Sequence, residues 1–269
     1  MDSRHVALER LLAVMIVVLF AVMGSMALST GLSTDLGQIE FMTQFALAVP
    51  FLTATSIAVA SYFAMFFAQQ KRLGDLIMSV VSLDLGVDSF LHMLAHRGSQ
   101  YSRFFELSAH KSDLLLMTGY LAAVVGTLCY SILESKVATR RQQILVILLG
   151  VVALPVTSLI ILFQPIQALL LLYETQFALL RTGLLVSIAV LTAVSLGYGL
   201  LKWKSRKHTV PTGIEALLVF MLAALLIKMT QTSDFQVAEL LTVSPVLFGF
   251  IVLAVSLLGT SMIDPLWRK

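Results

Sequence analysis

Four ionisable residues recur at intervals of four within the apolar segment DLGVDSFLHMLAH: Asp84, Asp88, His92 and His96. Residues four apart are neighbours on a helix, but each step turns by about 40°, so the four side chains form a slanting ribbon. Asp84 and His96 then point about 120° apart, which excludes a site where all four bind one small ligand. We expect a deeper acidic pair, Asp84 and Asp88, and an outer imidazole pair, His92 and His96.

A second set of ionisable residues begins the next apolar stretch, at His110 and Asp113. If the two stretches pack as neighbouring helices, this set meets His92, His96 and Asp88 near the outer surface of a membrane. Imidazole and carboxylate groups bind zinc, copper and iron. The predicted ligands of a transition metal are therefore His92, as the first candidate, with His96, His110 and Asp88.

The same residues are compatible with other chemistry. A haem would take His92 or His96 on one side and His110 on the other as axial ligands. Hydrogen bonds from the Asp and His side chains would alternatively tie helices together with nothing bound, or line a polar path for protons or a small ligand. The sequence leaves these alternatives open. It has no GxSxG, Walker or HExxH motif, so no catalytic residue is predicted.

Other ionisable residues within apolar stretches have simpler interpretations. Asp84, nearest the middle of the membrane, is expected to form a helix-to-helix hydrogen bond or to be a protonated switch. Glu174 and Arg181 are seven apart and share one helix face, where an ion-pair network at the outer end is expected. Lys228 is expected to extend its amine from a helix end towards water. A retinal Schiff base at Lys228 is disfavoured.

The composition defines the class of protein. The chain has 269 residues, 58% of them hydrophobic and 12% charged, with a mean hydropathy of +0.94. Soluble domains carry about 25% charged residues, so we predict a polytopic membrane protein. No soluble domain remains outside the apolar stretches, and residues 1–269 form one domain. The single cysteine, Cys129, allows no intrachain disulfide.

A membrane-spanning helix needs about 20 apolar residues, and the chain has eight such stretches. The fold class is therefore all-α, a bundle of eight transmembrane helices. The predicted spans are about 8–29, 40–68, 73–96, 110–133, 142–163, 168–201, 212–231 and 236–263. The first stretch also resembles a signal peptide, but its apolar run of about 17 residues favours an uncleaved helix.

Lysine and arginine alternate between the two sets of span ends, and thirteen of the eighteen lie in one set. Basic residues favour the cytoplasmic side, so both termini are predicted to be cytoplasmic, in the plasma (inner) membrane. The basic segment KWKSRKH at 202–208 is expected to contact anionic lipid rather than nucleic acid. The other set carries Arg97, Arg103, Lys111, Arg181 and Lys228.

The segment HMLAHRG, His92 to Gly98, resembles the end of a span in the MASE3 group of membrane-associated sensor domains, which has the form DLLHTLAYKG. His92, Leu94, Ala95 and Gly98 match this pattern, and Arg97 replaces Lys. The start of the next span, AHKSDLLLMTGY, lacks the aromatic and arginine residues of that group. The resemblance implies a prokaryotic sensory module that feeds a histidine-kinase or diguanylate-cyclase domain in the cytoplasm, and a homodimer.

Our leading hypothesis is thus a sensory and signal-transduction module. It would detect a metal, a haem-linked cue or a small molecule at the outer His/Asp site and pass the signal through the last span. The alternative is a stand-alone membrane protein, either a small transporter or a haem- or quinone-binding redox subunit. A transporter predicts an internal repeat, which the sequence lacks.

Overall fold

The structure, a computed structural model, describes residues 7–19, 21, 37–95, 109–163, 174–202, 210–230 and 235–263. These residues are helical apart from short connections at 71–72 and 134–139. Besides a helix at 7–19, the helices are α2 (Gly37–Gln70), α3 (Leu73–Ala95), α5 (Ala109–Leu133), α6 (Arg140–Ile147), η1 (Leu148–Ala153), α7 (Leu154–Phe163), α9 (Glu174–Lys202), α10 (Val210–Thr230) and α11 (Phe235–Ile263). The all-α prediction is confirmed for this part of the chain.

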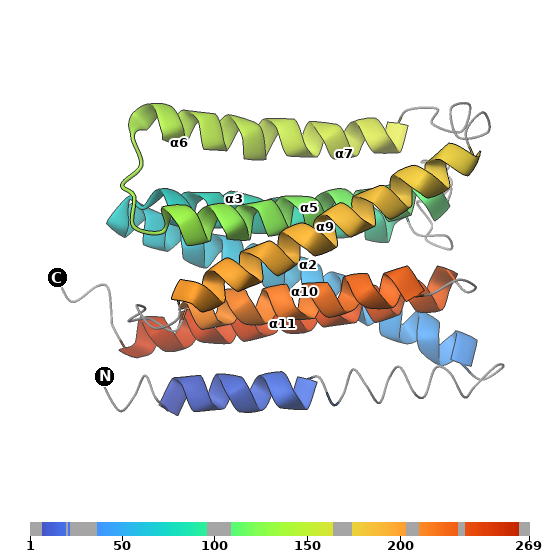
Figure 1. Ribbon diagram of the computed structural model, residues 1–269, viewed down its shortest axis with the longest axis horizontal. Helices are drawn as coiled ribbons and strands as arrows, with labels where there is room; N and C mark the ends of the chain where they lie inside the picture. Colours follow the sequence, from blue (N-terminus) through green and yellow to red (C-terminus); the bar gives the residue numbers. More distant parts are fainter. Residues whose placement is uncertain are drawn as a thin grey trace.

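The helices form an elongated bundle (Figure 1). α6, the π-helical segment η1 and α7 join end to end, and we call this continuous helix, residues 140–163, the edge helix. It lies along one edge of the bundle beside α3 and α5, whereas helix 7–19 lies along the opposite edge beside α10 and α11. α2 packs against both α3 and α11, and α9 crosses the bundle obliquely over α5 and α10.

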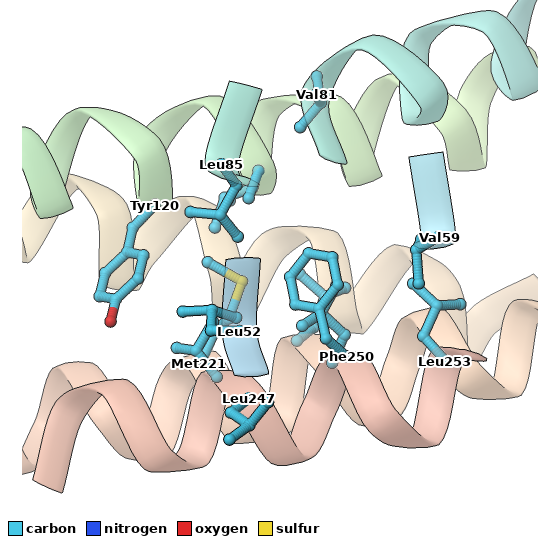
Figure 2. Close-up of a cluster of buried hydrophobic side chains, with 14 of the residues drawn as sticks. Leu52, Val59, Val81, Leu85, Tyr120, Met221, Leu247, Phe250 and Leu253 are labelled. Atoms are coloured by element: carbon cyan, nitrogen blue, oxygen red, sulfur yellow. The ribbon is translucent and has the colours of Figure 1, made fainter. Parts of the chain in front are cut away.

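Large apolar side chains fill the interior (Figure 2). Leu52 from α2, Leu85 from α3, Tyr120 from α5, and Met221 and Phe250 from the last two helices are each at most 1% exposed and belong to one cluster. Burial of a side chain of this size contributes about 1.5–3 kcal/mol. The core therefore joins helices that are distant in sequence.

Apolar side chains also cover much of the outside, as expected for a membrane protein. Four helices of the described part are long and apolar enough to cross a membrane: Ala48–Gln70, Arg181–Leu201, Thr212–Met229 and Val243–Ile263. The edge helix exposes Leu145, Leu148, Val152, Leu159 and Ile160 by 43–57%. A helix apolar both inside and outside suits a lipid environment.

Two connections at one end of the bundle are held together by their backbones. The Leu73 N–H donates to the Lys136 carbonyl at 2.7 Å, and the Ala138 N–H donates to the Lys71 carbonyl at 2.8 Å. Lys71 has a φ of 55°, a left-handed conformation that turns α2 into α3. We call residues 71–73 and 136–138 the loop clasp. It fixes the start of the edge helix relative to the start of α3.

Candidate functional site

One face of α3 is directed at the edge helix. The Val80 side chain lies where a side chain at Gly150 would be, and Asp88 accepts a hydrogen bond from Ser158. The two contact residues on α3, Val80 and Asp88, are eight positions apart, and their partners on the edge helix are also eight positions apart in the same order. The two helices therefore run in the same direction. Val80, Asp84 and Asp88 are spaced by four, which places Asp84 on this face between the two contacts.

Asp88 lies at the junction of three helices. Its side chain is 2% exposed, and its Oδ1 accepts a hydrogen bond from the Ser158 hydroxyl of α7 at 2.5 Å. On the other side, a Cβ at Gly119 of α5 would lie 3.2 Å from Asp88 Oδ2 and 2.9 Å from Leu85 Cδ1. Glycine therefore allows the backbone of α5 to approach the carboxyl group closely.

Asp84, one turn before Asp88, has a different environment. It is 3% exposed, and its Oδ1 has no hydrogen-bond partner in the described part of the structure. The facing segments 48–70, 115–133 and 142–160 contain no lysine, arginine or histidine. Asp84 therefore has no basic side chain opposite it on these three segments.

His92, the first predicted ligand, is fully buried one turn beyond Asp88. The prediction that the two stretches holding these residues pack together is confirmed, because α3 and α5 are neighbours. His96 lies outside the described residues, and for His110 and Asp113 only the backbone of α5 is described. Among the described residues, no group of three or more His, Cys, Asp or Glu side chains is arranged to hold a metal ion.

The other predicted polar residues lie elsewhere. Lys228 is buried on α10, at 4% exposure, so the expectation that its amine extends towards water is wrong: its Nζ is covered by the packing of the bundle. Arg181 is partly buried on α9. The side chain of Glu174 lies outside the described set, so the ion-pair network expected at this end of α9 is still a prediction. These residues belong to helices other than α3 and the edge helix.

The sequence did not single out Ser158 or Gly150. They are the buried positions among the described side chains of the edge helix, and each contacts α3. The available signal was a glycine and a serine within the largely apolar run 144–163 of this outward-facing helix, because small residues allow membrane helices to approach.

Comparison of the chain with known protein families, with curated proteins and with solved structures finds no match. The resemblance to MASE3 domains therefore stays a prediction based on the segment His92 to Gly98.

Proposed function

We propose that the protein is a sensory module embedded in the plasma membrane, with eight membrane-crossing helices and both termini in the cytoplasm. Five points of the chain support this topology, since they lie at one end of the bundle in Figure 1: the start of helix 7–19, the α2–α3 and α5–α6 connections, the facing ends of α9 and α10, and the end of α11. Most lysines and arginines of the sequence are close to these points.

The proposed input site is on the outer part of α3. The observation that carries this proposal is the burial of His92 one turn from Asp88, whose carboxyl group is bonded to the edge helix. Buried imidazole and carboxylate groups inside a membrane bundle mark functional sites. His96 and His110 would complete a set of ligands for a transition metal, or His110 would pair with His92 across a haem.

Ligand binding would act through the hydrogen bond between Asp88 and Ser158. A metal that engages Asp88 competes with the Ser158 hydroxyl for the carboxyl oxygens. The edge helix buries no side chain along α6, and its described buried positions are Gly150 and Ser158. Loss of one of these contacts would let the edge helix turn about the loop clasp, so the ligand favours one of two helix arrangements.

The packing also supports a route to the cytoplasm. α2 lies between α3 and α11, and it therefore transmits a displacement of α3 to the last helix. In the proposed module, α11 passes this displacement to a kinase or cyclase output within a homodimer, as the MASE3 resemblance implies.

The test is elemental analysis and visible spectroscopy of the purified full chain in detergent. The expected result is a stoichiometric metal, or a Soret band, that is lost in His92→Ala. The matched control is His208→Ala, which removes a histidine from the basic segment and should leave the bound group in place. The absence of both signals, or equal signals in the two variants, would overturn the proposed input site.

A further inference from the structure

The π-helical segment leaves the Gly150 carbonyl of the edge helix without its usual donor. The Leu154 N–H donates to the Leu149 carbonyl, five residues back rather than four. Pro155 follows and has no N–H. The Gly150 carbonyl would take its hydrogen bond from residue 154 in an α-helix, or from residue 155 in a π-helix. Neither donates to it, so this oxygen is available to another group.

The freed carbonyl lies between the levels of Val80 and Asp84 along α3. Gly150 is level with Val80, because the Val80 side chain occupies the space beside it. A helical carbonyl points towards the C-terminal end of its helix, and a helical side chain tilts towards the N-terminal end. The Gly150 oxygen therefore points from the level of Val80 towards the C-terminal ends of the two helices. The Asp84 carboxyl group points the opposite way, back towards the level of Val80.

Asp84 brings negative charge to this position without a counter-charge from the facing helices. Its Oδ1 is buried and has no hydrogen-bond partner among the described residues. The charged and titratable neighbours on α3 are Asp88, one turn away, which adds negative charge, and His92, a further turn away. The facing parts of α2, α5 and the edge helix contribute Tyr62, Tyr120, Tyr130 and Cys129, none of which is basic.

We propose that the Asp84 carboxylate and the Gly150 carbonyl are ligands of one hard metal cation, bound between α3 and the π-helical segment of the edge helix. Carboxylate and carbonyl oxygens suit Na⁺, Mg²⁺ and Ca²⁺, whereas the imidazoles further out suit transition metals. Asp88 adds a favourable field from one turn away, and water fills the remaining coordination positions. The two ligands of this site, Asp84 and Gly150, are distinct from the proposed sensory ligands, and Asp88 of the sensory set acts on the cation only through its charge.

The test measures cation binding to the purified full chain by equilibrium dialysis, with Na⁺, K⁺, Mg²⁺ and Ca²⁺ in separate arms at constant ionic strength. The expected result is one bound ion for one of the smaller or divalent cations, with K⁺ as the weak arm. Asp84→Asn should weaken binding at least tenfold. Asp75→Asn is the matched control, because Asp75 is a buried acid on the same helix with Arg72 close by, and it should leave binding unchanged.

Pro155→Ala tests the carbonyl independently. Alanine restores an N–H at this position, which lets the edge helix supply a donor to Gly150, so weaker cation binding is expected even though no acid is removed. Circular dichroism and size-exclusion chromatography check that each variant is folded. The proposal is overturned if no arm binds stoichiometrically, or if binding survives in both Asp84→Asn and Pro155→Ala.

Discussion

Replacing Ser158 by alanine should destabilise the bundle measurably, because the hydroxyl of Ser158 donates to a buried carboxyl group. Asp88 and Ser158 are each 2% exposed, so water does not readily replace the lost donor. A hydrogen bond to a charged group contributes about 1.5–3 kcal/mol, and one to a neutral group about 0.5–1.5 kcal/mol. We expect a loss of about 1.5–3 kcal/mol if the Asp88 carboxyl group is ionised in the folded protein.

The free energy of unfolding can be measured by denaturant titration in mixed detergent micelles. Ser187→Ala is the matched control, since the Ser187 hydroxyl donates at 2.7 Å to the Gly183 carbonyl of its own helix at an exposed position. Its effect should stay within about 0.5 kcal/mol, as for most surface substitutions. Introducing Asp88→Ala into the wild-type protein and into Ser158→Ala completes a double-mutant cycle that isolates the coupling between Ser158 and Asp88, because alanine keeps no acceptor for the hydroxyl.

The coupling energy decides between two states of Asp88. A coupling of about 1.5 kcal/mol or more indicates an ionised acceptor, and a smaller one indicates a neutral acceptor. If Ser158→Ala costs no more than Ser187→Ala and the coupling is zero, the edge helix is not held at Asp88. The proposed route from the input site to the edge helix would then be refuted.

Three further substitutions test the packing of the same region by unfolding measurements. Gly150→Ala should destabilise the protein by about 1–3 kcal/mol, because the new Cβ overlaps the Val80 side chain. Adding Val80→Ala should restore most of this loss. If it does not, α3 and the edge helix do not approach closely at Gly150. Thr139→Ala removes the capping box that begins α6, so the free energy of unfolding should fall by about 0.5–2 kcal/mol. Amide hydrogen exchange in the first turn of α6 should also become faster. Unchanged exchange would argue against the cap. Lys71→Val should be at least about 1 kcal/mol less stable than Lys71→Gly, because glycine adopts the left-handed conformation freely, and equal stabilities would exclude that conformation.

The helices themselves were predictable from the sequence. Long apolar stretches satisfy their backbone groups only as helices in a membrane, and the boundaries found for α3, Leu73–Ala95, and for α11, Phe235–Ile263, agree with the predicted 73–96 and 236–263. The spacing of Asp84, Asp88 and His92 also indicated one continuous ribbon on a helix, and all three are buried on α3.

The partners of these side chains were not predictable. The sequence suggested Asp84 as a helix-to-helix hydrogen-bond group, but its Oδ1 has no hydrogen-bond partner in the described part of the structure, whereas Asp88 accepts a hydrogen bond from Ser158 of another helix. That pair is 70 residues apart in the sequence. Helix periodicity gives the direction of a side chain on its own helix, whereas the identity of the facing residue depends on how two helices pack.

The edge helix shows a second limit. A proline inside a helix removes an N–H donor, and the structure places the π-helical segment Leu148–Ala153 just before Pro155. The sequence could not show that the loosened turn faces α3, because this follows from the contact between Gly150 and Val80. The ends of the predicted ligand set, His96 and the side chain of His110, lie outside the described residues.

The most direct test of the sensory account is a distance measurement between the edge helix and the core of the bundle. Spin labels at the exposed positions Leu159 and Leu226, in a Cys129→Ser background, report the separation of α7 from α10 in the full chain. Addition of Zn²⁺ should shift the distance distribution, and His92→Ala should abolish the shift. A distribution that stays the same while Zn²⁺ binds stoichiometrically would contradict the proposed coupling of ligand binding to movement of the edge helix.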